Sequence, residues 1–177
     1  MAISKEETLG KINIFAQARL LLLLSLAFLI PFYFNIQWIT GPIINAILII
    51  VLFLSGRFAA YCAAFIPSLA AIAGGLLSPM MFFAVPFIVF SNILYIFSVD
   101  KVYNNFKNEF KGYWFGVIVG SLIKFLFIFI SINVVAHFFI KQTMVVKMIN
   151  MFSWPQLFNA LLGGIIAWLF LKWLKRF

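Results

Sequence analysis

Lys124 is the residue whose position most strongly indicates chemistry, because it is the one formal charge placed deep in an apolar segment of the chain. It stands within residues 116–139, which read GVIVGSLIKFLFIFISINVVAHFF. A lysine at the centre of a bilayer helix costs roughly 2.5 to 3.5 kcal/mol on insertion scales, and such residues face protein, water or a partner. The sequence therefore predicts that this ammonium meets a polar group or a bound anion.

The neighbours of Lys124 along the helix indicate which way it faces. Gly120 and Ser121 precede it by four and three residues, and Ser131 follows it by seven. These spacings place all four residues on one stripe of an α-helix. Small residues on that stripe allow a second helix to approach closely. We therefore expect Lys124 to face the interior of a helix bundle.

Other polar residues stand inside apolar segments at depths that could bring them near Lys124. Asn45 follows Thr40, Gly41 and Pro42, and at 1.5 Å per residue it lies roughly 9 Å inside the membrane interface. Asn159 lies at a similar depth. The predicted substrate-binding residues are Lys124, Asn45, Asn92, Trp154, Gln156 and Asn159. They would form an outward-facing pocket with Lys124 as its floor, hydrogen bonds from Asn45, Gln156 and Asn159, and Trp154 as a stacking or capping group.

Two alternatives stay open for these residues. Each Asn or Gln could instead form a hydrogen bond between helices, which is a common role for amides in membrane proteins. Lys124 could be a structural partner of Asn92 or of backbone carbonyls. His137, near the outer end of its span, is a further candidate for the pocket. Residues 141–153 are apolar enough to lie on the membrane surface or to cover the pocket as a lid.

The composition assigns the chain to the membrane proteins. Apolar residues make up 66% of it and the mean hydropathy is +1.14, whereas soluble domains are about 45 to 50% apolar. In a soluble protein the net charge of +9 would suggest nucleic acid. Here the basic residues lie between apolar segments, so they indicate topology and no nucleic-acid partner. The single cysteine, Cys62, can form no internal disulfide.

Six apolar segments approach the length of roughly 20 residues that a helix needs to cross a bilayer. They lie at about 14–34, 39–55, 58–77, 80–99, 113–137 and 154–174. The sequence therefore predicts an all-α polytopic membrane protein, with residues 1–177 forming one transmembrane domain. Very short turns at 55–57 and 78–79 predict antiparallel neighbours.

The distribution of Lys and Arg predicts the orientation. With the amino terminus inside, the inner segments hold Lys5, Lys11, Arg19, Arg57, Lys101, Lys107, Lys111, Lys172, Lys175 and Arg176, and the outer segments hold only Lys141 and Lys147. Basic residues favour the cytoplasmic side. This asymmetry predicts an even number of spans with both termini cytoplasmic.

The chain lacks the motifs of the common enzyme classes. It contains no Walker A, HExxH, GxSxG or CxxC sequence, and it has four acidic residues and one histidine. These counts leave little for carboxylate chemistry or metal ligation. We therefore expect no enzymatic activity, no metal and no cofactor. Because no ATP site is present, active transport would need a partner that supplies energy.

Several short motifs together resemble a known family. They are Thr40-Gly41-Pro42 with Asn45, then Pro67, Pro86 with Asn92, Lys124, and Ser153-Trp154-Pro155-Gln156 followed by Gly163-Gly164. Over nearly the whole chain this pattern resembles the S components, the substrate-binding subunits, of energy-coupling factor (ECF) transporters, and in particular a poorly characterised S-component-like group. The resemblance implies capture of a vitamin-like or other small compound from outside a bacterial cell membrane. It also implies a transmembrane coupling protein and two cytoplasmic ATPase subunits as partners.

The chain departs from that family on its first helix. Many S components carry an Ala-xxx-Ala pattern there for contact with the coupling subunit, whereas this helix reads Gln17-Ala18-Arg19 followed by a Leu run. The third segment offers a surface of small residues between Ala59 and Gly75 that could pack internally or replace that contact. The leading hypothesis is a substrate-binding transport subunit. The alternative is a non-catalytic assembly subunit of a larger membrane complex that uses the small surfaces and the basic inner loop.

Overall fold

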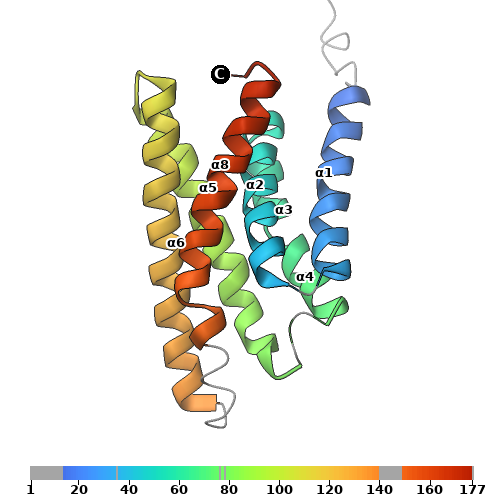
Figure 1. The fold of residues 1–177 in the computed structure, drawn as a ribbon, viewed down its shortest axis with the longest axis vertical. Coiled ribbons are helices and arrows are strands. Elements are labelled where there is room, and N and C mark those ends of the chain that lie inside the picture. Colours follow the sequence, from blue (N-terminus) through green and yellow to red (C-terminus); the bar gives the residue numbers. More distant parts are fainter. Residues whose placement is uncertain (1–13, 35, 76, 78, 140–148, 177) are drawn as a thin grey trace, which may run out of the picture.

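The computed structural model describes residues 14–34, 36–75, 77, 79–139 and 149–176, and every regular element in that part of the chain is helical. The helices are α1 (Ile14–Tyr33), α2 (Gln37–Ser55), α3 (Arg57–Ala63), α4 (Ile66–Ala73), the 3-10 helix η1 (Pro79–Ala84), α5 (Val85–Asn105), α6 (Glu109–Phe139) and α8 (Trp154–Trp173). Figure 1 shows them as one bundle of roughly parallel and antiparallel rods. The predicted all-α class is confirmed.

Five segments are long and apolar enough to cross a membrane: Ile14–Tyr33, Gln37–Ser55, Phe82–Asn105, Glu109–Val134 and Ile149–Trp173. The chain is therefore a multi-pass helical membrane protein. The third predicted span, 58–77, has a different form, because it consists of α3 and α4 with a break at Ala64 and Phe65. Pro67 contributes to this break, since it has no N–H to donate to the carbonyl four residues earlier.

The two ends of the bundle differ in charge. The start of α1 and the end of α8 lie at the same end (Figure 1). Because α2, α5 and α8 run toward this end and α1, α3 and α6 start from it, eight described cations gather there: Arg19, Arg57, Lys101, Lys107, Lys111, Lys172, Lys175 and Arg176. We call this the basic end. Lys124 is the one described lysine or arginine that lies away from it.

The main core surrounds α2. Leu48, Ile49 and Val51 are fully buried, and they belong to one cluster with Tyr95 and Val117 from α5 and α6. Two buried tyrosines connect the bundle through hydrogen bonds to carbonyls of α8. Tyr95 Oη donates to Ala160 O (2.8 Å), and Tyr113 Oη donates to Gly164 O (2.6 Å). Helix α8 is thereby joined to α5 and α6 in addition to its packing on α2.

The small residues of α3 and α4 pack inside the chain. Ala60, Ala63, Ala64 and Ala70 are fully buried, and Gly74 lies so close to the backbone of Phe32 that a Cβ on it would lie 2.6 Å from Phe32 Cα. Most of the small surface predicted on the third segment is therefore covered by this protein's own helices. It is not an open face for another membrane protein.

Helix α1 lies at the edge of the bundle (Figure 1). Its buried residues are Leu23, Ala27 and Pro31, which recur every four residues and so form one inward stripe. The remaining faces carry large exposed apolar side chains such as Leu21 and Leu22. This composition fits contact with lipid.

Candidate functional site

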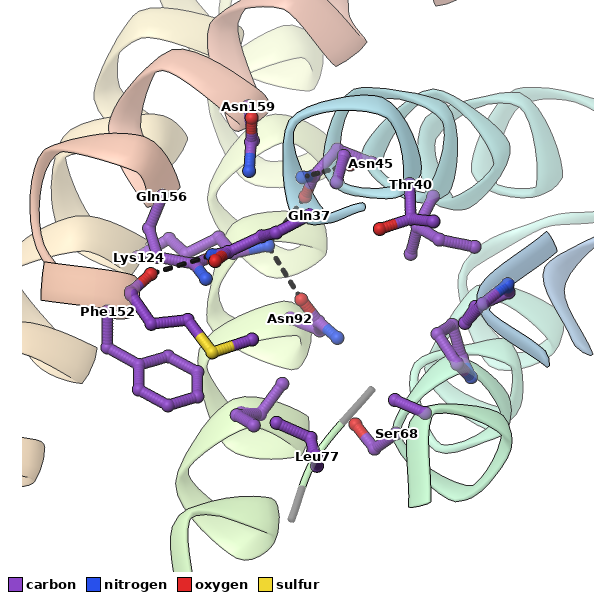
Figure 2. Close-up of a pocket in the computed structure, with 17 residues that line it drawn as sticks. Gln37, Thr40, Asn45, Ser68, Leu77, Asn92, Lys124, Phe152, Gln156 and Asn159 are labelled. Atoms are coloured by element: carbon purple, nitrogen blue, oxygen red, sulfur yellow. Dashed lines mark hydrogen bonds between the residues drawn. The ribbon is translucent and has the colours of Figure 1, made fainter. Parts of the chain in front are cut away.

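A cavity of about 90 Å³ lies between the helices in the half of the bundle away from the basic end. Its walls come from the end of α1 and the first half of α2, from α4, α5, α6 and α8, and from residues 151–152. The polar residues that line it are Gln37, Thr40, Asn45, Ser68, Asn92, Lys124, Gln156 and Asn159, and the apolar ones include Pro31, Pro67, Leu77 and Phe152. Figure 2 shows Asn45 and Thr40 near each other on α2, with Lys124 and Gln156 on one side of the cavity and Ser68 on the other.

Lys124 is held by two amides from two other helices. Its side chain is 3% exposed, and its Nζ donates to Asn45 Oδ1 (2.5 Å) and to Asn92 Oδ1 (2.7 Å). The ammonium also lies 5.4 Å from the ring centroid of Tyr95, within the range of a cation–π contact. The structural partnership with Asn92 that the sequence suggested is therefore present, and Asn45 is a second partner.

Backbone carbonyls orient both amides. Asn45 Nδ2 donates to Gly41 O (2.8 Å), one turn earlier in α2. Asn92 Nδ2 lies 3.5 Å from its acceptor, the carbonyl of Ala64 at the break between α3 and α4. With each nitrogen directed to a carbonyl, each amide oxygen is left to face Lys124. The break in the third segment thus contributes directly to the geometry of the site.

The charge on Lys124 has no described counter-ion. Its partners are neutral amides, and the two acidic residues in the described part of the chain, Asp100 and Glu109, lie toward the basic end, near the end of α5 and the start of α6. An opposite charge within about 4 to 6 Å favours the charged form of a buried group. Hydrogen bonds to amides satisfy two ammonium protons, but they leave a net positive charge beside the cavity.

Asn159 supplies the second unusual feature of the cavity. It is 1% exposed, and neither Nδ2 nor Oδ1 has a hydrogen-bond partner among the described residues. The hydroxyl of Ser68, across the cavity, is likewise buried without a described partner. Leaving such a group unpaired costs about 1 to 3 kcal/mol, and native proteins rarely do so away from ligands or ordered water. The cavity therefore offers a donor and an acceptor at Asn159 in addition to the cation.

Two glycines permit the close packing that creates this arrangement. A Cβ on Gly41 would overlap the Asn159 amide, so glycine there leaves room for that side chain. A Cβ on Gly163 would lie 2.5 Å from Asn45 Cβ and 2.9 Å from both Ala46 N and Pro42 O. Helices α2 and α8 therefore meet at backbone distance where Asn45 and Asn159 face the cavity.

Five of the six predicted site residues line the cavity, and Trp154 does not. Trp154 is 63% exposed, and its ring stacks on Phe125 at a centroid distance of 5.5 Å. The stacking or capping role predicted for Trp154 is therefore not supported by its position. Gln156, two residues later in α8, lines the cavity as predicted. The side chain of His137 and residues 141–148 of the predicted lid lie outside the described part.

Several lining residues were not among the predicted binding residues. Gln37, Thr40 and Ser68 line the cavity alongside the predicted set, and so do Met151 and Phe152 from the segment 141–153 that was predicted as a possible lid. Gln37, the first residue of α2, donates from Nε2 to Met151 O (2.6 Å). Phe152 is 2% exposed. A polar residue directly after an intramembrane proline, as Ser68 follows Pro67, is the kind of signal that could have identified that position.

The described residues contain no group of three or more His, Cys, Asp or Glu side chains that could hold a metal ion. The polar groups at the cavity are an ammonium, amides and hydroxyls, which recognise anions and hydrogen-bonding edges. Comparisons with protein-family models, with curated proteins and with solved structures returned no match to this chain. The structure therefore shows a multi-pass helical membrane protein whose polar cavity contains a buried lysine.

Proposed function

We propose that this protein is a membrane-embedded substrate-binding subunit of an ECF-type importer, and that its cavity binds an anionic group of a small compound. One observation carries the proposal: the ammonium of Lys124 lines the cavity without a described counter-ion, and the unpaired amide of Asn159 lines the same cavity. An anion placed between them satisfies both groups together. A purely structural lysine would explain the bonds to Asn45 and Asn92, but it would not explain Asn159.

The chemistry of the site favours a carboxylate or a phosphate as that group. Hydrogen bonds between an ammonium and an anionic oxygen are roughly twice as strong as those between neutral groups. A dry surrounding strengthens the attraction between the two charges. Such a ligand would also offset the cost of burying Lys124, which is roughly 2.5 to 3.5 kcal/mol. The amides of Asn159 and Gln156 would then bind the polar edges of the same ligand.

The size of the cavity limits what it holds in this conformation. Pockets for drug-sized ligands measure about 300 to 1,000 Å³, whereas this cavity measures about 90 Å³. That volume suits the anionic group of a ligand and not a whole vitamin. A vitamin-like compound would therefore require the walls of the cavity to move apart.

The position of the cavity supports uptake from the outer side of a bacterial cytoplasmic membrane. The cavity lies in the half of the bundle away from the basic end, and basic residues favour the cytoplasm. Delivery to the inside would then depend on a transmembrane coupling protein and ATPase subunits, as the resemblance implies. The contact with that coupling protein would not use the small residues of α3 and α4, because most of them are buried.

The proposal is tested by identifying what the protein carries. The full chain is purified in a mild detergent without added ligand, and small molecules released on denaturation are measured by mass spectrometry. We expect about one acidic compound per chain. Replacing Lys124 by Met should lower its retention at least about tenfold, because a charge-assisted bond is worth roughly 1.5 kcal/mol or more. Lys101→Met, at an exposed position of the basic end, is the matched control and should retain the compound.

Two results would overturn the proposal. One is equal small-molecule content in the wild type and in a Lys124→Met protein that still unfolds cooperatively. The other is recovery of protein subunits alone, with no small compound, which would identify an assembly subunit. If Lys124→Met fails to fold, Asn159→Leu provides the same comparison without removing the bonds that Lys124 makes to α2 and α5.

A further inference from the structure

A second site lies at the basic end, where the start of α6 meets the end of α8. A groove of about 670 Å³ is lined there by Lys107, Asn108, Glu109, Phe110, Trp168 and Lys172. Phe110 and Trp168 pack together with a ring centroid distance of 6.2 Å. Lys172 Nζ lies 4.8 Å from the centroid of Trp168. The groove is therefore lined by two lysines, one glutamate and the aromatic side chains of Phe110 and Trp168.

An apolar groove continues from this site along α6. It measures about 470 Å³ and is lined by Phe106, Phe110, Lys111, Trp114, Phe115 and Ile118. Phe110 lines both grooves, so the two are neighbours and meet at this residue. From Phe110 to Ile118 the helix rises roughly 12 Å at 1.5 Å per residue. The apolar groove thus runs from the charged end of the helix toward the middle of the bilayer.

We propose that the two grooves together bind one anionic phospholipid. The phosphate lies beside Lys107 and Lys172, and an acyl chain follows the apolar groove past Phe115 and Ile118. Basic pockets between helices on the cytoplasmic side are suited to lipid head groups, and aromatic rings favour the level of the head groups. A soluble anion would use only the lysines. A cytoplasmic protein would not reach Ile118, which lies at membrane depth.

This lipid site is independent of the proposed substrate site. Its residues come from the start of α6 and the end of α8, whereas the cavity around Lys124 lies in the other half of the bundle. A lipid bound at the basic end would fasten α8 to α6 next to Trp114 and Trp168, whose ring centroids are 5.8 Å apart. We therefore expect its removal to loosen that end without emptying the cavity.

The test measures lipid preference by native mass spectrometry. The purified full chain is mixed with equal amounts of phosphatidylglycerol and phosphatidylcholine that carry the same acyl chains. We expect the wild type to retain one phosphatidylglycerol in preference. The double variant Lys107→Gln with Lys172→Gln should reduce that preference roughly 10- to 30-fold, since each basic residue near the membrane surface contributes about 1 kcal/mol. Lys172→Arg should keep it.

A control variant distinguishes binding by the groove lysines from a general effect of positive charge at the basic end. The double variant Arg57→Gln with Lys101→Gln removes the same charge from the same end, outside the two grooves, and should keep the wild-type preference. Equal loss in the control and in the groove variant would overturn the proposal. Equal retention of the two lipids by the wild type would do so as well. Free glycerophosphoglycerol, which has no acyl chains, should not displace the lipid, and displacement at matched concentration would rule out a role for the apolar groove.

Discussion

At the scale of single residues, Lys124 and Asn159 differ in whether their buried polar atoms have hydrogen-bond partners. Both side chains are almost fully buried, at 3% and 1% exposure. Lys124 has two short hydrogen bonds, whereas both amide atoms of Asn159 have no partner among the described residues. A paired residue can be retained for stability alone. An unpaired one lowers stability, so its presence next to a cation is better explained by a ligand.

Replacing Asn159 by Leu, which has nearly the same shape, should therefore have two effects of opposite sign. The ligand-free protein should gain roughly 1 to 3 kcal/mol in its free energy of unfolding, because an unpaired buried amide is removed. Retention of the bound compound should fall about tenfold, which corresponds to about 1.4 kcal/mol. Steric trapping in detergent micelles would measure the first effect, and mass spectrometry of released compounds the second.

Asn133→Leu is the matched control for that experiment. Asn133 Nδ2 already donates to Phe129 O (2.7 Å), and Asn133 does not line the cavity. This variant should gain no stability and should retain the compound. A stability loss in Asn159→Leu, with unchanged retention, would show that Asn159 serves the fold and not a ligand.

At the scale of elements, the contact between α2 and α8 determines whether the site can form. Gly163 brings the backbone of α8 against Asn45, Ala46 and Pro42. Asn45 in turn holds Lys124, which belongs to α6. One close contact between two helices therefore controls the position of a residue on a third.

Gly163→Ala should disturb both stability and binding. The new methyl group would lie within 2.9 Å of backbone atoms of α2, which cannot rotate away as a side chain can, so the helices must separate. Overpacking of this kind typically costs about 1 to 3 kcal/mol. Thermal unfolding in detergent should show that loss, together with weaker retention of the bound compound.

Leu162→Ala is the control on the neighbouring position of α8, where the side chain is 45% exposed. Exposed substitutions usually change stability by about 0.5 kcal/mol or less. If both variants unfold at the same temperature as the wild type, the close packing of α8 on α2 at Gly163 does not position Asn45.

At the scale of the whole molecule, charge and polarity are separated along the membrane normal. The described cations other than Lys124 gather at one end, and the cavity lies in the opposite half (Figure 1). Because basic residues favour the cytoplasmic side of a membrane, we expect the basic end to be cytoplasmic and the cavity half to face outward. The proposed direction of capture depends on this orientation.

Cysteine labelling tests this orientation. In a Cys62→Ala background, Asn150→Cys should react with a membrane-impermeant maleimide in intact cells, because it precedes α8 at the outer end. Asn105→Cys, at the end of α5, should react only after permeabilisation. Both asparagines are exposed and neutral, so neither substitution alters the charge that directs insertion. The reverse pattern would contradict the proposed direction of capture. Labelling of both cysteines from the same side would show that α6 does not cross the membrane between them.

Much of the architecture follows from the sequence, because the cost of exposing backbone polar groups to lipid leaves helices as the solution for long apolar segments. The class, most of the helix positions and the inward direction of Lys124 could be inferred in this way. The third segment could not be assigned fully, since a proline at Pro67 is compatible with a kinked span or with two helices. The structure shows two helices, α3 and α4, with Ala64 at their break.

The site shows the same division between local and tertiary information. Polarity and depth in the apolar segments identified Asn45, Asn92 and Asn159 as candidates for the interior, because a polar side chain in lipid favours the bundle interior. The sequence suggested Asn92 as one possible partner of Lys124, but it could not choose among the candidates, since they lie on three different helices. Only the packing of α2, α5 and α8 around Lys124 paired it with Asn45 and Asn92, left Asn159 unpaired and directed Trp154 outward. Sequence alone thus determined which residues must avoid lipid, and tertiary structure decided which of them meet, because that depends on contacts between segments far apart in the chain.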